Sequence, residues 1–284
     1  MMKHIFMLLF VWLHIDVFFR FWNRKKVTII SYHNPTVEVF SSHIEFLMKK
    51  YVIISMNDFL SKVNFPNNSL IITFDDGHKN NVELLPVIKK YSLMPVIYLC
   101  SQVVATNHPF WWKCLNGNSA EPYKKCTNIG RLQLLKEKKL YYPKMVLSSP
   151  HGLTKDDINT LKNYVIFGSH TRIHPILPQC TQEEQWDEIA NSKKELEALC
   201  DCPIEHFAYP NGDYNNNSIE CVKLAGYKTA RTTDVGWNDE NTNRYKLRVI
   251  GISDDADMLK LRFQLSGLSL WIQYLLKGSF RGRK

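Results

Sequence analysis

Residues 69–78 carry the sequence Ser-Leu-Ile-Ile-Thr-Phe-Asp-Asp-Gly-His, an apolar run that ends in two adjacent carboxylates. Buried strands of parallel sheets are continuous runs of such apolar residues, and the catalytic groups of α/β barrels lie where the strands end. Asp75 and Asp76 would repel each other there unless a cation or a proton held them together. Taken alone, these residues are more simply explained as an Asp-Asp-Gly turn, so a second motif must decide.

The second motif is residues 167–175, Phe-Gly-Ser-His-Thr-Arg-Ile-His-Pro. His170 and His174 would lie on one face of a helical turn, from which two imidazoles can converge on one metal ion. Alone, such a pair is more often a surface coincidence. Together with Asp76 it forms the three-ligand set with an open position that is typical of a catalytic zinc or related divalent ion. Asp75 would then be free to act as a base.

Both motifs resemble the first two signatures of the polysaccharide deacetylases, the NodB-homology domain of carbohydrate esterase family four. The matching residues are Thr73-Phe74-Asp75-Asp76-Gly77 and His170-Thr171-Arg172-Ile173-His174. Phe207-Ala208-Tyr209-Pro210-Asn211-Gly212 resembles a Tyr-Pro variant of the third signature. The resemblance extends over residues 28–252. It implies a distorted barrel, a metal-dependent N-deacetylase, Asp75 as general base, and a backbone amide near Asn211 that holds the oxyanion.

The rest of the chain is consistent with an α/β fold. Its 284 residues are 45% hydrophobic, enough for one large core. Apolar runs suited to strands occur at 27–31, 51–55, 70–74, 95–99, 164–167, 205–209, 228–232 and 247–252. Helical stretches lie between them, and Thr181-x-x-Glu184 predicts a capping box. We therefore predict a single-domain, distorted or incomplete (β/α) barrel over residues 27–255.

Two groups expected from the family pattern are missing. The usual arginine of the third signature is replaced by Ala208, its aromatic by Asn211, and no histidine follows His206 to serve as the late general acid. If the barrel nearly closes, the first and last strands can supply replacements. His33 ends the first strand and is the predicted acid, as in family members with a Tyr-Pro signature that use an early histidine. Arg248, on the last strand, is the predicted partner of Asp75; a plain strand-end histidine and a surface cation are the alternatives.

Several other residues are predicted to bind substrate or to have a structural role. Tyr209, Pro210 and Asn211 are predicted to contact substrate. Trp112, in the Phe110-Trp111-Trp112-Lys113 segment, is predicted to stack on a sugar ring, although simple packing explains such pairs more often. His78 is expected to be solvated. A charged helix start accounts for the acidic residues Glu183, Glu184, Asp187 and Glu188.

Both ends of the chain suggest contact with a membrane. Residues 5–22 are apolar but interrupted by His14, Asp16 and Arg20, and no signal-peptide cleavage site follows them. We predict that residues 1–26 associate with a membrane and that the basic cluster after them favours the cytoplasmic face. Residues 256–284 are predicted to form a basic amphipathic helix, either at the membrane interface or packed on the barrel.

The net charge and the cysteine content indicate which partners and which compartment suit the protein. The net charge of +9 suits anionic headgroups or an acidic glycan, and dispersed basic residues without a recognition motif argue against nucleic acid. Seven cysteines form no disulfide framework, so free thiols in a reducing compartment are expected.

These features together predict a metal-dependent hydrolase that removes N-acetyl groups from an N-acetylated sugar in cell-envelope or capsular polysaccharide metabolism. Zinc is the expected metal, while cobalt, nickel and manganese accept the same ligands. Two alternatives stay open. One is hydrolysis of another carbon–nitrogen amide, and the other is a catalytically inactive glycan-binding protein that has kept the metal site.

Overall fold

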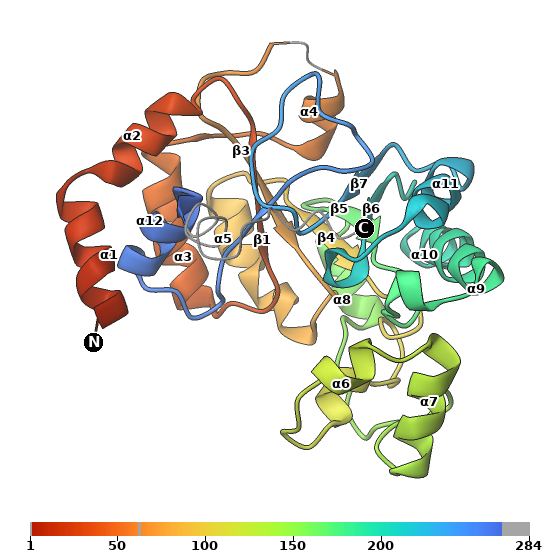
Figure 1. The fold of residues 1–284 in the computed structure, drawn as a ribbon. Helices are drawn as coiled ribbons and strands as arrows, with labels where there is room; N and C mark the ends of the chain where they lie inside the picture. The colour runs from red at the N-terminus through yellow and green to blue at the C-terminus, as the bar shows by residue number, and fades with distance from the viewer. Residues whose placement is uncertain (1, 62–63, 269–284) are drawn as a thin grey trace.

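The computed structural model describes residues 2–61 and 64–268, and within them eight strands form one sheet (Figure 1). The strands are β1 (Thr28–Tyr32), β2 (Val52–Ile53), β3 (Ser69–Phe74), β4 (Val96–Leu99), β5 (Ile166–Ser169), β6 (His206–Ala208), β7 (Thr229–Arg231) and β8 (Ile250–Gly251). Each strand overlaps one of the apolar runs found in the sequence. The apolar runs in the sequence therefore predicted the positions of these strands.

The sheet is an incomplete barrel, as predicted. Its strand order is β7-β6-β5-β4-β3-β1-β8, with β2 paired to the start of β3, and every strand pair is parallel. A single parallel bridge, between Arg231 and Leu247, joins the region of β7 to the segment that leads into β8. Because parallel strands all end at one edge, the residues that follow β1, β3, β5 and β6 meet at the same mouth of the barrel.

Side chains of β3 alternate between two apolar cores, since successive residues of a strand point to opposite faces. Leu70, Ile72 and Phe74 belong to the larger core, between the sheet and the surrounding helices. Ile71 belongs to a smaller core inside the barrel, which also contains Tyr98 from β4. Burial on both faces explains why the strand sequence is continuously apolar.

Seventeen helical segments are described in residues 2–61 and 64–268. They are α1 (Met2–Trp12), α2 (Ile15–Trp22), α3 (Val37–Met48), α4 (Met56–Ser61), η1 (Lys79–Leu84), α5 (Leu85–Lys90), η2 (Trp111–Cys114), α6 (Glu121–Lys124), α7 (Asn128–Glu137), α8 (Lys155–Leu161), η3 (Leu177–Gln179), α9 (Gln182–Trp186), the π-helical η4 (Asp187–Asn191), α10 (Ser192–Cys200), η5 (Pro210–Gly212), α11 (Asn216–Leu224) and α12 (Met258–Leu265). The capping box predicted at Thr181 and Glu184 is confirmed, with both reciprocal hydrogen bonds present.

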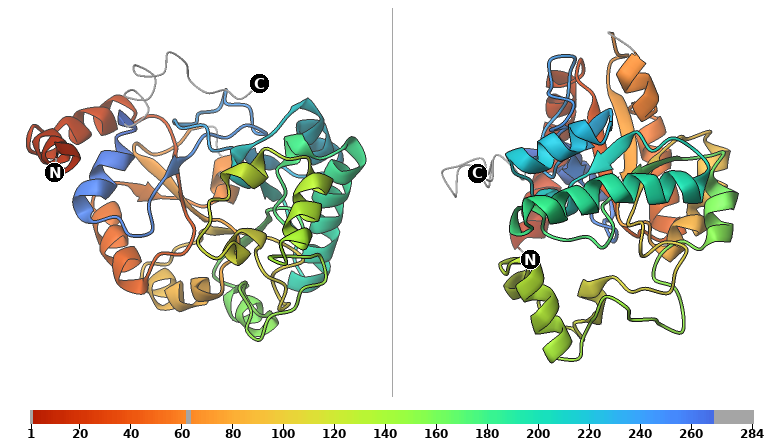
Figure 2. Two further views of the ribbon diagram at one scale, coloured as in Figure 1. Left: turned by 60° about the horizontal axis from the view of Figure 1, so that its bottom comes forward. Right: turned by 90° about the vertical axis from the view of Figure 1, so that its right-hand side faces the viewer.

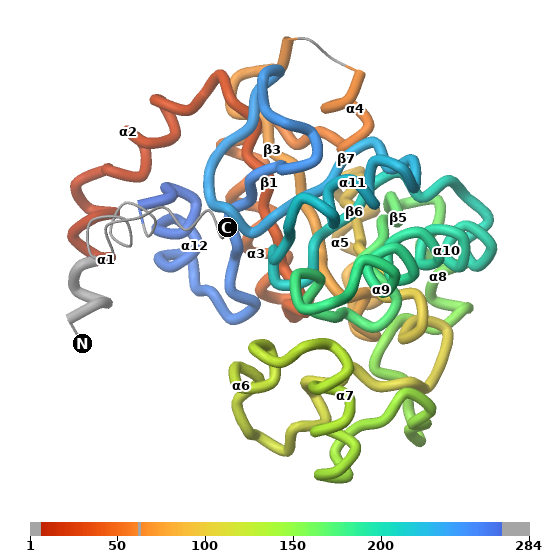
Figure 3. Tube along the Cα trace, turned by 45° about the vertical axis from the view of Figure 1, so that its right-hand side comes forward, coloured from red at the N-terminus to blue at the C-terminus, as the bar shows by residue number. Residues whose placement is uncertain are grey.

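The segment between β4 and β5 forms a small lobe that projects from the barrel and carries α6 and α7 (Figures 2 and 3). The lobe has an apolar core of its own, made of Trp111, Leu115, Tyr123, Leu135 and Tyr141. Its first turn, η2, runs alongside the barrel mouth, because the indole of Trp111 donates a hydrogen bond to the carbonyl of His174 at 3.0 Å. The lobe is therefore a wall of the predicted site.

The first two helices and the last described helix lie together on one side of the barrel. Helix α12 packs against α1, α2 and α3. No helix within residues 2–61 and 64–268 has the length and apolar content that crossing a bilayer requires. The predicted amphipathic helix at 256–284 falls mostly outside the described residues, which end at 268. The seven cysteines are all free thiols, as expected.

Candidate active site

The three predicted metal ligands converge at the mouth of the barrel. Asp76 follows β3, whereas His170 and His174 follow β5. Their ligand atoms all lie within 4.8 Å of one another, and the Nε2 atoms of both histidines are 3.6 Å from Oδ1 of Asp76. All three side chains are buried. The sequence motifs thus meet in space as a compact set of two imidazoles and one carboxylate.

The two histidines do not converge through a helical turn, as their spacing suggested. Residues 170–174 form an irregular loop in which Thr171 and His174 have φ values of 69° and 57°. Such left-handed conformations are unfavourable, above all for a β-branched residue, and must be held by neighbours. The carboxylate of Glu188 accepts hydrogen bonds from the amides of Arg172 and Ile173 at 2.8 and 3.2 Å.

Glu188 is consequently a support of the site and not part of a charged helix start. It is buried, within the π-helical turn η4, and burial raises the pKa of its carboxyl to about 7. Single π-helical turns often occur at functional sites. Here the side chain of Glu188 supports the loop that carries both histidines.

Hydrogen bonds orient the ligand atoms. Nδ1 of His170 donates to the carbonyl of Ala208 at 2.7 Å, which leaves its Nε2 unprotonated and facing Asp76. Partners of this kind hold metal-binding histidines in the required tautomer. Within residues 2–61 and 64–268, the buried Oδ1 of Asp76 accepts no hydrogen bond. A buried carboxylate oxygen of this sort, between two free imidazole nitrogens, is suited to a divalent cation.

His78 is not solvated but supports Asp76. It is 6% exposed, and its Nε2 lies 3.1 Å from Oδ2 of Asp76. Nδ1 of the same ring accepts a hydrogen bond from Lys113 of the lobe at 3.2 Å. Both bonds together require the Nε2–H tautomer of a neutral imidazole. A chain from Lys113 through His78 to Asp76 therefore ties the lobe to the metal-ligand set.

The electrostatics favour the protonation states that a metal site needs. Burial alone would raise the pKa of Asp76, but the hydrogen bond from His78 and the nearby imidazoles lower it below its usual range. Burial lowers the pKa of His170, and burial with the neighbouring His170 lowers that of His174 to about 3. The carboxylate is therefore charged and both imidazoles are neutral at neutral pH.

Asp75 is paired with Arg231 and not with Arg248. The guanidinium of Arg231 donates to Oδ1 of Asp75, and both side chains are buried. Burial raises the pKa of Asp75, but the charge of Arg231 together with the nearby His170 and His33 outweighs burial, so the net shift is downward. Arg248 lies elsewhere, against Gly236 and Asn238, so its predicted role was wrong.

The parallel register explains why Arg231 can replace the missing arginine of the third signature. Arg231 on β7 is the direct partner of Ala208 on β6, the position where the family has its arginine. A guanidinium from the neighbouring strand thus reaches the carboxylate of Asp75.

His33 lies beside Asp75, at the end of β1, as predicted. Its Nε2 is 4.0 Å from Oδ2 of Asp75, and its side chain is 54% exposed. The backbone around it is fixed, because its amide donates to Asp254 and its carbonyl accepts from Asn81. The imidazole therefore stands at the solvent side of the base, where a substrate would enter.

Tyr209, which was predicted to contact substrate, is instead buried in the core. Its ring packs in the larger core beside Phe207 and Tyr214, and its hydroxyl donates to the carbonyl of Tyr245. Pro210 is also buried, whereas Asn211 is half-exposed with a φ of 53°.

Trp112 does lie at the site. Its ring is 4.4 Å from that of His174 and stacks on Phe110 with 4.8 Å between centroids. The ring is half-buried, so part of it faces solvent next to the metal-ligand set.

An open parallel α/β barrel thus holds a buried Asp-His-His set, which is a candidate metal site, beside a second aspartate that is paired with arginine. A family model described as polysaccharide deacetylase matches residues 62–230. The chain belongs to this family, whose members are hydrolases that act on carbon–nitrogen bonds other than peptide bonds.

Individual relatives are more distant. The protein YxkH of Bacillus subtilis (strain 168) is 24% identical over 185 residues, which cover 65% of this chain and 51% of YxkH. The chain thus spans about half the length of that curated relative. The Streptococcus pyogenes deacetylase PplD in complex with acetate is 19% identical, with a TM-score of 0.63 over 84% of this chain and 98% of that one. The de-N-acetylase of Aggregatibacter actinomycetemcomitans is 14% identical, with a TM-score of 0.62 over 84% of this chain and 99% of that one. At these identities the two structures support the fold.

Proposed function

We propose that this protein is a metal-dependent N-deacetylase that releases acetate from an N-acetylated sugar. The observation that carries the proposal is the arrangement at the barrel mouth. The Asp-His-His set lies next to a separate aspartate that is charged, buried and paired with Arg231. Amide hydrolysis needs both parts: an electrophilic centre for the carbonyl and a base for water.

Asp76, His170 and His174 would hold the divalent ion, for which zinc is the best candidate. Cobalt, nickel and manganese suit the same three ligands. When bound, the ion supplies Lewis acidity, which polarises the acetamido carbonyl and makes water more acidic. The fit rests on the orphaned Oδ1 of Asp76 and the free Nε2 atom of His170.

Two side chains of the protein carry out the proton transfers, one as base and one as acid. Asp75 accepts a proton from the attacking water, and Arg231 keeps that carboxylate ionised and correctly oriented. His33 donates a proton to the sugar nitrogen as the carbon–nitrogen bond breaks, so that acetate and a free amine are released. Asn211, at the tip of its loop, is the candidate to hold the oxyanion through its backbone amide.

The substrate side of the proposal rests on Trp112 and on the charge of the chain. Part of the Trp112 ring is exposed next to His174, where it can stack on a sugar ring. The apolar, basic ends of the chain favour a polymer made at a membrane, as in cell-envelope or capsular polysaccharide synthesis. We keep the cytoplasmic face as the predicted side, on the basis of the basic residues after position 22.

Removal and return of the metal test the function directly. Purified protein is treated with a chelator, and acetate release from an N-acetylglucosamine oligomer is measured before and after zinc or cobalt is added. We expect chelation to abolish release and either metal to restore it, because Asp76, His170 and His174 cannot polarise the carbonyl alone. The variant His170→Ala should bind no metal and release no acetate.

Each of the other outcomes identifies an alternative. Stoichiometric metal binding without acetate release, even from a simple acetylated amide, would favour an inactive glycan-binding protein. Release from the simple amide alone would favour a non-sugar substrate. Absence of metal binding would contradict the site itself.

The role of His33 can be separated from that of the base by the choice of leaving group. His33→Gln should lower kcat on the acetylated oligomer by about 10²-fold, since the amine must be protonated as it leaves. Hydrolysis of an aryl acetate should change little, because a phenolate leaves without a proton. His14→Gln, at an exposed histidine outside the site, is the matched control. Equal losses on both substrates would contradict the role of His33 as acid.

A further inference from the structure

The first two helices fold back along the barrel as a bent pair, which we call the α1–α2 arm. The bend is at His14, which adopts the left-handed conformation with a φ of 55°. The arm consists of α1 (Met2–Trp12) and α2 (Ile15–Trp22) and leads directly into β1 (Figure 1). The apolar stretch seen in the sequence is therefore two short helices and not one long one.

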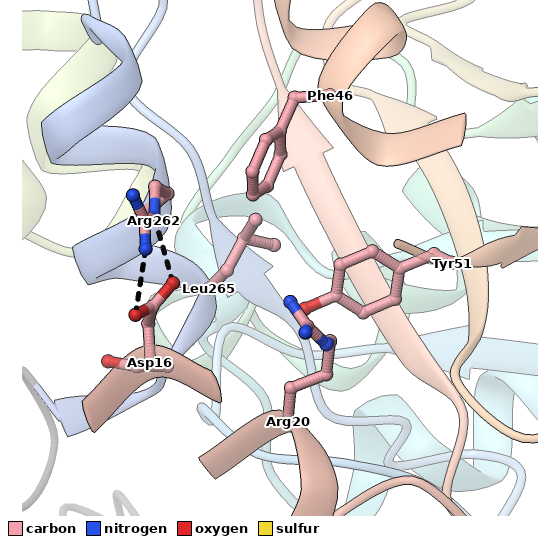
Figure 4. A pocket seen from close by; sticks show the side chains of 7 residues that line it. Asp16, Arg20, Phe46, Tyr51, Arg262 and Leu265 are labelled. Carbon is pink, nitrogen blue, oxygen red and sulfur yellow. Dashed lines mark hydrogen bonds and ion pairs between the residues drawn. The ribbon is translucent and has the colours of Figure 1, made fainter. Parts of the chain in front are cut away.

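One face of the arm is fastened to α12. The carboxylate of Asp16 accepts hydrogen bonds from Nε and Nη2 of Arg262 at 2.8 and 3.0 Å (Figure 4). The ring of Phe10 meets that of Phe263 edge-on, with 5.3 Å between centroids. Asp16 is only 7% exposed. The acidic residue that interrupts the apolar sequence thus faces the protein, where it anchors the arm.

The opposite face of the arm is apolar and open to solvent. Eight large apolar residues are exposed there: Leu8, Leu9, Trp12, Leu13, Val17, Phe18, Phe21 and Trp22. They recur at helical spacing, and the two tryptophans are the most exposed of the set, at 74% and 73%. A helix face with so many exposed apolar side chains marks an interaction site.

The charged residues of the arm itself and of the segment that follows it are mostly basic. Residues 1–26 contain the basic residues Lys3, Arg20, Arg24, Lys25 and Lys26 and a single acidic one, Asp16. Arg262 neutralises Asp16, so the basic residues are unopposed within the arm. Arg24 also lies over the ring of Phe21 at 4.0 Å, which places a cation at the edge of the apolar face.

We propose that the α1–α2 arm binds the surface of a bilayer that contains anionic lipids, with its helices parallel to the membrane. Exposed tryptophan and phenylalanine with flanking arginine and lysine are the composition of interfacial helices. An apolar face flanked by mostly basic residues complements anionic headgroups better than a mixed protein surface. The proposal is independent of the chemistry proposed for the active site.

Vesicle binding by the full chain tests the proposal. We expect sedimentation with vesicles of phosphatidylglycerol and phosphatidylcholine, and weaker binding to phosphatidylcholine alone or at high salt. The double variant Trp12→Ser, Phe18→Ser should weaken binding by about tenfold or more. Lys25→Glu should reduce the preference for anionic vesicles. Leu224→Ser, which removes a side chain that is 74% exposed on α11, is the matched control and should bind as the native chain does.

Two further measurements keep the result unambiguous. Acetate release from a soluble oligomer and the thermal midpoint should be the same in all variants, because the substituted side chains are exposed and belong to none of the site's elements. Native protein that does not bind anionic vesicles at low salt would overturn the proposal. Unchanged binding by the double variant would also overturn it, as would a native dimer that this variant dissociates, since the face would then be covered by a second copy.

Discussion

Asp75→Asn should lower kcat/KM for acetate release by about 10²–10⁴-fold, the usual contribution of a general base. Asparagine has nearly the same shape and its amide oxygen can still accept a hydrogen bond from Arg231, but it cannot take a proton from water. The proposed metal ligands are untouched. We therefore expect stoichiometric zinc binding and a near-native thermal midpoint, measured by calorimetry on the same sample.

The control for this experiment is Asp255→Asn, because Asp255 has an exposed carboxylate that pairs with Lys260 outside the site. It should leave both turnover and metal binding unchanged. Full turnover by Asp75→Asn would remove the base from the mechanism, whereas loss of zinc by that variant would mean that Asp75 is itself a ligand.

Arg231→Met should affect both stability and pH dependence. It leaves Asp75 buried without its cation, and removal of one partner from a buried ion pair costs about 3–5 kcal/mol of unfolding free energy. In the native chain Arg231 holds the pKa of Asp75 below its usual value, so the pair contributes stability that is lost only as the pH falls through that lowered pKa. In the variant the guanidinium no longer offsets burial, so we expect the pKa of Asp75 to rise.

Two observable changes are expected for Arg231→Met. The acid limb of the pH profile of kcat/KM should move to higher pH. In denaturant unfolding of the metal-free protein, the free energy of unfolding should be lowered most near neutral pH, and the difference from the native chain should shrink as Asp75 takes up a proton on acidification. Arg248→Met is the matched control and should change neither quantity. If Arg248→Met instead gave these effects, Arg248 and not Arg231 would be the partner of Asp75.

Sequence patterns predicted the strands and the metal-ligand set because both depend on local order. Apolar runs mark strands that are buried on both faces, and a strand end determines where Asp76 and His170 lie. The partner of Asp75 depends on register between strands, which a single sequence does not contain. Arg231 did leave a signal, since it is a charged residue inside an otherwise uncharged strand, whereas Arg248 was chosen only because the barrel was expected to close.

The predictions of a solvated His78 and of a solvent-facing Glu188 at a helix start were wrong for a related reason. Both are polar residues in segments that look solvent-exposed in sequence, and both are buried by elements remote in the chain. His78 is covered by the lobe through Lys113 and Phe110, and Glu188 by the loop that it supports. Burial by distant elements cannot be read from local periodicity, so supporting residues of a site are the hardest to predict.

The apolar side chains of the lobe between β4 and β5 pack on one another, and Asn128 of α7 donates a hydrogen bond to Glu184 of α9 at 2.8 Å. Apolar side chains inside the lobe can therefore change together without compensating changes in the barrel, whereas Asn128 is bonded to α9. The turn at Trp111 and Trp112 nevertheless belongs both to the lobe and to the rim of the site. Redesign of the protein for a different substrate would therefore begin with the interior and tip of the lobe, while the contacts of Trp111, Lys113 and Asn128 with the barrel are kept.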